Sequence, residues 1–189
     1  MATLTAAMLD DLHRGCAAIS LLPYSSGVNL ATIDFEGADQ IFTLKDTFQI
    51  NQADPTTEEI KIDQGNRTID VDTETGEFNI TGQIPSVATA LFDFFYSQAL
   101  ATAGATGQSG TVYTGKTYFN TPKEVQCSVL VESQSKKTAV GFANVKFTAV
   151  MVNDDNSKPL YLKFTGTVLL NSTANQGDIM VYKQVVSGP

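Results

Sequence analysis

The chain has 189 residues and a net charge of −8; 42% of its residues are hydrophobic and only 17% are charged. This length and hydrophobic content suffice for one full hydrophobic core and exclude a disordered chain. The negative charge disfavours electrostatic binding to nucleic acid or to a membrane surface, because neutralising phosphates requires clustered Lys and Arg.

Residues 1–30 are expected to form an N-terminal arm. Within it, residues 4–12 have the apolar spacing of a short amphipathic helix, which Gly15 would end. His13, the single histidine, is interpreted as a surface residue, because a zinc site or a catalytic triad needs partners at defined spacing. The sequence shows neither a secretion signal nor an apolar run long enough for a membrane span, so synthesis inside the cell is expected.

The next segment, residues 41–50, alternates polar residues with apolar ones at Phe42, Leu44, Phe48 and Ile50. Alternation with a period of two predicts a strand. Residues 51–60 are polar almost throughout and are expected to form a loop.

Residues 69–81 gather four acidic side chains around Gly76, namely Asp70, Asp72, Glu74 and Glu77. An EF-hand loop counted from Asp70 would need glycine at its sixth position and glutamate at its twelfth, and this sequence has threonine at both. Alternation on either side instead predicts a hairpin of strands 69–72 and 78–81, with Gly76 supplying the positive φ of its loop. The acidic residues then form a surface and not a metal site.

Residues 86–100 predict one long helix, with an N-cap at Ser86 and helical spacing at Val87, Leu91, Phe94, Phe95 and Gln98. Its aromatic face, which includes Phe92, is expected to pack against a sheet. The small residues of 101–111 are then expected to form a mobile loop or spacer.

The second half of the chain predicts strands at 123–133, 139–152 and 160–170 and a last strand near the C-terminus. The two middle strands form a hairpin about twice as long as strands of ordinary domains. Its odd-numbered positions from Ala139 to Met151 and its even-numbered positions from Leu160 to Leu170 are apolar. Such a hairpin suits a sheet that continues into an assembly or around a barrel wall. For an assembly, the polar candidates for inter-subunit contact are Asn144, Lys146, Thr148, Lys163, Thr165 and Thr167.

Residue patterns that carry catalysis or cofactor binding are missing. The stretch 104–111 lacks the Lys-Ser/Thr ending of a phosphate-binding loop, and no nucleophile elbow occurs. Cys16 and Cys127 permit one disulfide, but two reduced, buried thiols are the preferred interpretation. We expect no enzyme activity, no metal and no cofactor.

Charge is distributed unevenly, with a net −10 over residues 1–77 and +3 over residues 133–189. One interpretation is ordinary variation over a solvated surface. The other is a subunit with unlike ends that stacks head to tail, since such contacts build rings or open filaments.

Two stretches together resemble the tail tube proteins of long-tailed bacteriophages, a family related to the inner tubes of contractile injection systems. They are residues 70–96, the acidic hairpin running into the helix, and the hairpin residues 147–170. The resemblance implies a mainly β subunit, an antiparallel sandwich or barrel with one flanking helix and long hairpins. It also implies stacked hexameric rings, found in the virion tail and assembled in the host cytoplasm, which contact other tail proteins and let DNA pass without specific binding.

The same resemblance gives roles to charged residues. Glu58 and Glu59 are expected to meet Lys136 and Lys137 of the next ring. The four acids of 69–81 are expected to face the lumen, where an acidic wall repels DNA, or the outer surface. Lys146 and Lys163 depart from an acidic lumen unless neighbouring side chains neutralise them.

Two other classes stay open at this point. A phage head-decoration or head–tail completion protein would share the β-rich composition but form trimers or a single ring. A small-ligand-binding β-barrel would be monomeric, with an apolar interior open to its ligand.

Overall fold

We describe a computed structural model of the protein over residues 15–62, 67–85, 89–153, 160–172 and 176–185. This part is mainly β, with antiparallel strands and one short helix, α2 (Thr89–Phe95), as the sequence predicts. The strands are β1 (Ala18–Pro23), β2 (Asp39–Ile41), β3 (Gln49–Gln52), β4 (Thr56–Ile62), β5 (Arg67–Glu74), β6 (Phe78–Ile84), β7 (Tyr96–Thr106), β8 (Val112–Pro122), β9 (Val125–Glu132), β10 (Thr138–Val152), β11 (Tyr161–Val168) and β12 (Ile179–Lys183).

Eight strands form one sheet in the order β2-β1-β9-β10-β11-β6-β3, with β12 beside β10. Ile41 of β2 and Ile80 of β6 stand near opposite ends of this order, yet they belong to one buried cluster. Phe78 of β6 also contacts Phe142 of β10, with ring centroids 5.6 Å apart. The sheet therefore curls around its core, although the described strands do not close into a barrel.

The long hairpin predicted at 139–170 is confirmed as β10 and β11, which pair from Val145↔Val168 to Val152↔Tyr161. The predicted alternation holds only beyond a bulge between Phe142 and Val145. After the bulge, odd-numbered residues such as Phe147 face the main core. Before the bulge, the even-numbered residue Phe142 faces it. The bulge adds one residue to β10, which reverses the side that each later side chain faces.

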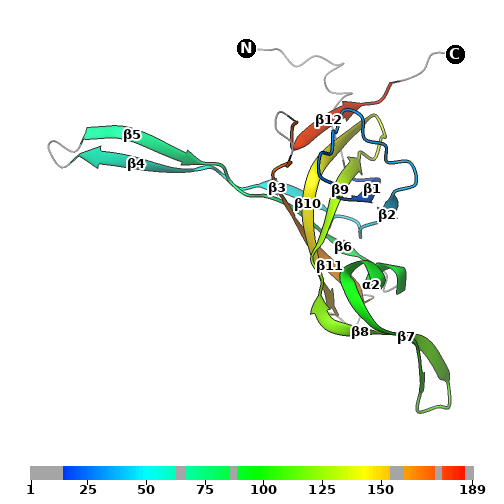
Figure 1. The fold of residues 1–189 in the computed structure, drawn as a ribbon. Coiled ribbons are helices and arrows are strands. Elements are labelled where there is room, and N and C mark those ends of the chain that lie inside the picture. The colour runs from blue at the N-terminus through cyan, green and yellow to red at the C-terminus, as the bar shows by residue number, and fades with distance from the viewer. Residues whose placement is uncertain (1–14, 63–66, 86–88, 154–159, 173–175, 186–189) are drawn as a thin grey trace.

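Two hairpins project from the curled sheet in different directions (Figure 1). β4 and β5 form one two-stranded sheet, here called the acidic arm, and β7 and β8 form another, the neutral arm. An isolated two-stranded hairpin is marginally stable in water. Each arm is therefore a surface that would gain stability from a partner.

The acidic arm corrects two predictions. The predicted loop 51–60 contains the end of β3 and most of β4, and β5 pairs with β4 instead of with β6. Threonine and glutamate at residues 56–59 look loop-like because all four are exposed, on both sides of the arm. Gly76 does not supply a positive φ. An added Cβ there would lie 1.8 Å from the carbonyl oxygen of Ala53, so glycine permits a close crossing of two chain segments.

The structure of the neutral arm corrects two further predictions from the sequence. The predicted helix 86–100 is shorter, because α2 ends at Phe95 and Tyr96 begins β7. The predicted loop 101–111 is the end of β7 and a tight turn, in which the Gly107 amide donates to the Thr111 carbonyl at 2.8 Å. Pairing with β8 replaces helix here, since tertiary context overrides local propensity.

Near the N-terminus, residues 18–23 are not part of an arm: β1 lies between β2 and β9 within the sheet. The predicted strand 41–50 is mostly a connection: only Ile41 at the end of β2 and residues 49–50 at the start of β3 are strand, and Phe42 between them is 59% exposed. The N-terminal helix predicted at 4–12, with His13 beside it, falls outside the described residues.

Candidate functional site

A polar surface covers the outer side of the sheet from β9 to β3, and we call it the polar sheet face. Cross-strand partners in an antiparallel sheet point to the same side. The register therefore aligns one row of Gln126, Lys146, Thr167, Asn79 and Asn51 and a second row of Thr148, Thr165, Thr81 and Gln49. Sequence reasoning found only the β10 and β11 part, because β6 and β3 join the face through long-range pairing.

The face carries little net charge despite its two lysines. Lys146 Nζ lies 2.8 Å from a carboxylate oxygen of Glu124. Lys163 is exposed and lines the same shallow depression as Asp46. Asn144, predicted on this face, is buried instead, and its amide donates to the Leu170 carbonyl at 3.2 Å.

The acidic arm brings together residues that the sequence analysis had treated as two sites. Glu58 is paired with Asp72 and Thr56 with Glu74, so these side chains share one side of the arm. Glu59 pairs with Val71 and points to the other side. Asp70 pairs with Ile60, although its side chain is outside the described ones. Like charges directly opposite each other are destabilising, which favours a basic partner for this side.

Glu77 lies beyond the end of β5, where it accepts a hydrogen bond from the Asn79 amide at 3.2 Å. It therefore belongs to the margin of the polar sheet face and not to the acidic arm.

The two predicted lysines lie in the turn between β9 and β10, away from the acidic arm (Figure 1). Lys136 has a positive φ of 58°, and the Lys137 carbonyl accepts the Gln184 amide at 2.8 Å. Because Thr138 pairs with Lys183, a third lysine joins them, which sequence spacing gave no reason to expect. We call these three the lysine turn. A contact between it and the acidic arm would join two copies of the chain.

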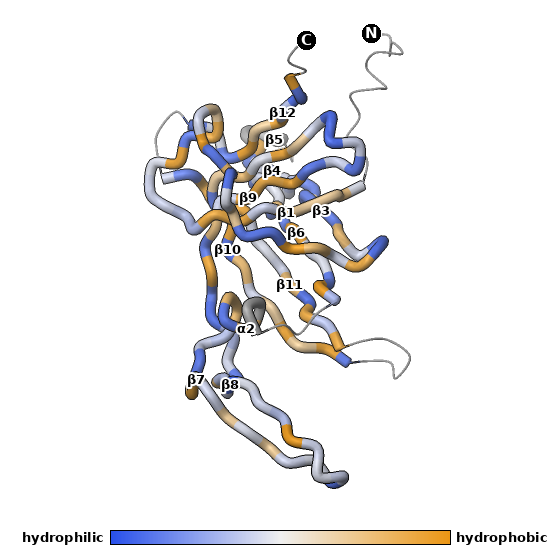
Figure 2. The backbone as a smooth tube through the Cα atoms, turned by 90° about the vertical axis from the view of Figure 1, so that its right-hand side faces the viewer, coloured by the Kyte–Doolittle hydropathy of each residue, from blue (hydrophilic) through white to orange (hydrophobic). Residues whose placement is uncertain are grey.

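The neutral arm differs from the rest of the surface in composition. Residues 94–115 contain no Asp, Glu, Lys or Arg. Figure 2 shows most of this arm in pale colours of intermediate hydropathy, whereas the body alternates blue and orange. Four large apolar side chains on it are exposed: Leu100 (60%), Val112 (71%), Tyr113 (59%) and Phe119 (59%).

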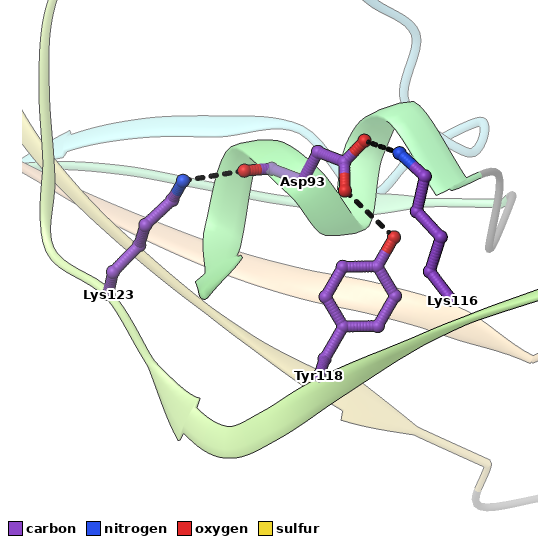
Figure 3. A network of polar contacts seen from close by, with 4 residues as sticks. All are labelled: Asp93, Lys116, Tyr118 and Lys123. Carbon is purple, nitrogen blue, oxygen red and sulfur yellow. Dashed lines mark hydrogen bonds and ion pairs between the residues drawn. The ribbon is translucent and has the colours of Figure 1, made fainter. Parts of the chain in front are cut away.

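A cluster of polar contacts holds the root of the neutral arm against α2 (Figure 3). The Asp93 carboxylate accepts from Lys116 Nζ at 2.5 Å and from the Tyr118 hydroxyl at 2.9 Å. Lys123 Nζ donates to the Asp93 carbonyl at 2.5 Å. The Lys116 bond, with the Tyr118 bond second, lowers the pKa of Asp93 below its ordinary value, and the Asp93 bond raises the pKa of Lys116.

Beside this cluster lies an apolar groove of about 540 Å³, here called the root groove. The described residues that line it include no charged side chain and are Phe92, Tyr96, Tyr118, Phe119, Asn120, Pro122, Val150 and Met151. The Tyr96 hydroxyl donates to the Ala149 carbonyl at 3.2 Å, so the groove follows the end of β10.

Both cysteines are free thiols, as predicted, with Cys127 buried and Cys16 half-buried. Burial raises the pKa of Cys127 to about 12 and that of Cys16 to about 11, with smaller contributions from Asp39 and Glu132 respectively. Both thiols stay protonated and unreactive at neutral pH.

Within the described residues, no three His, Cys, Asp or Glu side chains are grouped to hold a metal ion. No described helix is long and apolar enough to cross a membrane. Comparison of the chain with models of known protein families and with curated protein sequences gives no match.

Proposed function

We propose that this chain is a structural protein that assembles into stacked hexameric rings, forming the tail tube of a long-tailed bacteriophage and a passage for DNA. The observation that carries the proposal is the polar sheet face, a broad layer of Thr, Asn and Gln across five strands with almost no net charge.

This composition suits a channel wall for DNA. Tight binding to a phosphate backbone requires several unneutralised Lys or Arg side chains. On the polar sheet face, Lys146 is paired with Glu124 and Lys163 is near Asp46. Hydroxyl and amide side chains keep the wall hydrated, so DNA passes along it without being bound.

Two open strand edges bound this face and allow the sheets of neighbouring copies to join. Among the described strands, β3 pairs only with β6. The last pair between β9 and β10 is Val125↔Phe147, so residues 148–152 have a strand partner, β11, on one side only. Unpaired edges invite pairing with another chain.

The acidic arm and the lysine turn give the stack its direction. A contact between unlike surfaces repeats from copy to copy and builds an open stack. Glu58, on the side of the arm that it shares with Asp72, meets Lys136 and Lys137 of the next ring, whereas Glu59 points to the other side. Each exposed ion pair is worth roughly 0–1 kcal/mol, but repetition around a ring fixes the register.

The two other classes fit less well. A ligand-binding barrel is disfavoured because the described sheet is not closed and its interior is filled by Phe142, Phe147 and Phe164. A head-decoration or completion protein would share the fold, and it differs in forming trimers or a single ring. The fold and its open strand edges suit a structural protein without enzyme activity that assembles with other tail proteins.

Electron microscopy of the purified protein in negative stain tests the proposal, which expects hollow tubes or stacked rings. Trimers would favour decoration, and a monomer at all concentrations would refute assembly.

A matched pair of variants tests the strand that carries the face. Thr148→Pro removes an amide proton at a position paired with Thr165 and should abolish rings. Thr148→Val keeps that amide and should assemble normally. Circular dichroism shows whether each variant is folded, and normal rings from folded Thr148→Pro would mean that β10 has no part in the ring.

A further inference from the structure

The neutral arm exposes unpaired strand edges and apolar side chains to solvent. Its strands form a sheet with no third strand among those described, so both outer edges are unpaired. Natural proteins usually protect such edges with charged side chains, and this arm has none over residues 94–115. Near its tip, Val112 and Tyr113 are 71% and 59% exposed.

The root groove, where the base of the neutral arm meets α2 and the end of β10, is the matching surface. Phe119, Val150 and Met151 on its walls are 59%, 50% and 54% exposed, and none of the described residues that line it is charged. It also runs beside the part of β10 that lacks a second strand partner. An extended segment placed there would bury apolar side chains and could add backbone hydrogen bonds to that edge.

Electrostatics indicate that a second copy of this chain fills the groove. Each copy carries a net charge of −8, so most approaches between copies are repulsive. The neutral arm and the root groove are large uncharged surfaces, and a contact between them avoids this repulsion. Beside the groove, Asp93 and Lys116 form an ion pair, so these two charges offset each other.

The arm tip cannot reach the groove of its own copy. Val112 is at the start of β8, and Phe119 on the groove wall is seven residues along the same strand. At roughly 3.3 Å per residue, the strand keeps them about 23 Å apart. The contact is therefore between copies, and it joins unlike surfaces.

We propose that Val112 and Tyr113 at the tip of the neutral arm dock into the root groove of a second copy, against Phe119, Val150 and Met151. The contact rests on the proposed self-assembly and names the two surfaces that meet. Because tip and groove differ, each copy offers one of each, and the contact repeats around a ring or along a stack.

Disulfide trapping tests the contact in the full chain. Val112→Cys and Met151→Cys are introduced together in a Cys16→Ala background and oxidised mildly, and products are separated without reductant. The distance within one copy is far beyond the Cα separation of a disulfide, so every cross-link joins two copies. The double variant should give a ladder of more than two linked chains, whereas each single variant should give dimers at most.

Val181 provides a matched control, because it is also a valine with 71% of its surface exposed, on β12. Val181→Cys combined with Met151→Cys should give no ladder. A ladder from this control as strong as that from the Val112 variant would overturn the proposal, since the cross-linking would then be non-specific.

A charge exchange gives a second readout. Val112→Asp and Met151→Lys should each raise the concentration needed for assembly by about tenfold or more, because each buries an unpaired charge. Together they should restore assembly at least in part.

The results separate the contact from the proposed function. Tubes without a ladder overturn the contact and leave the function standing. A ladder and charge rescue without tubes or rings support the contact and refute the tail tube.

Discussion

The acidic arm and the neutral arm are built alike and differ in almost every side chain. Each is one antiparallel pair that leaves the body of the protein. The acidic arm sets Glu58 opposite Asp72, whereas the neutral arm has no charge over residues 94–115. We therefore expect the same backbone to serve two kinds of contact, one that depends on salt and one that depends on apolar burial.

The arms are also anchored differently. β5 runs on into β6 through Gly76, where the chain passes close to the Ala53 carbonyl. β7 follows α2 directly, and α2 is fixed by Phe95, which is completely buried. The neutral arm is thus tied to the core by a helix, and the acidic arm only by strands that it continues.

The largest effect should come from breaking the anchor of the neutral arm. Phe95→Ala removes a fully buried ring that packs edge-on against Phe94, with centroids 4.8 Å apart. We expect a loss of about 3–5 kcal/mol in the free energy of unfolding, measured by urea denaturation. Phe119→Ala, at a ring that is 59% exposed, should change stability far less. Equal effects from the two variants would contradict the assigned anchor.

The body of the protein follows from the sequence because its strands have one apolar side. β10 and β11 alternate over most of their length, and Phe147 and Phe164 lie in the core as the pattern predicts. The bulge in β10 could not be foreseen, since Ala143 is buried on the opposite side against Val28 and Leu30.

The arms escaped prediction for a physical reason. Periodicity reports burial on one side, and an arm that exposes both sides has no period. Residues 51–60 therefore looked like a loop, and residues 96–100 at the start of β7 looked like the end of a helix. The root groove could not be predicted either, because α2, β8 and β10 are separate in the sequence and meet there only in the folded protein.

A second, intermediate effect should come from reversing the charge of the acidic arm. Glu58→Lys with Asp72→Lys should weaken stacking at low salt, because the side of the arm that carries both would then face the lysine turn with like charge. Adding Lys136→Glu and Lys137→Glu should restore stacking and return the net charge to −8. Sedimentation at low and high salt measures the change.

High salt should reduce the difference between wild type and the reversed variant, because exposed charges are screened over about 10 Å at 0.1 M. Wild-type stacking by the reversed variant at low salt would remove the acidic arm from the contact between rings. The neutral arm should be insensitive to the same salt change, which separates the two arms in one experiment.

The smallest effect should come from the polar cluster at the root of the neutral arm. The pKa of Asp93 is lowered chiefly by its bond from Lys116, so the folded state favours the carboxylate. A lowered folded pKa stabilises the fold above the ordinary value of about 4 and loses this contribution as the pH falls below it. Asp93→Asn should therefore unfold at a slightly lower temperature than wild type at pH 7, and the difference should shrink below about pH 4.

Hydrogen exchange in the Asp93→Asn variant should quicken in β7 and β8 and not in β4 and β5. A difference in unfolding temperature that grows as the pH falls would mean that Asp93 is protonated in the folded protein and that the ion pair does not hold the arm.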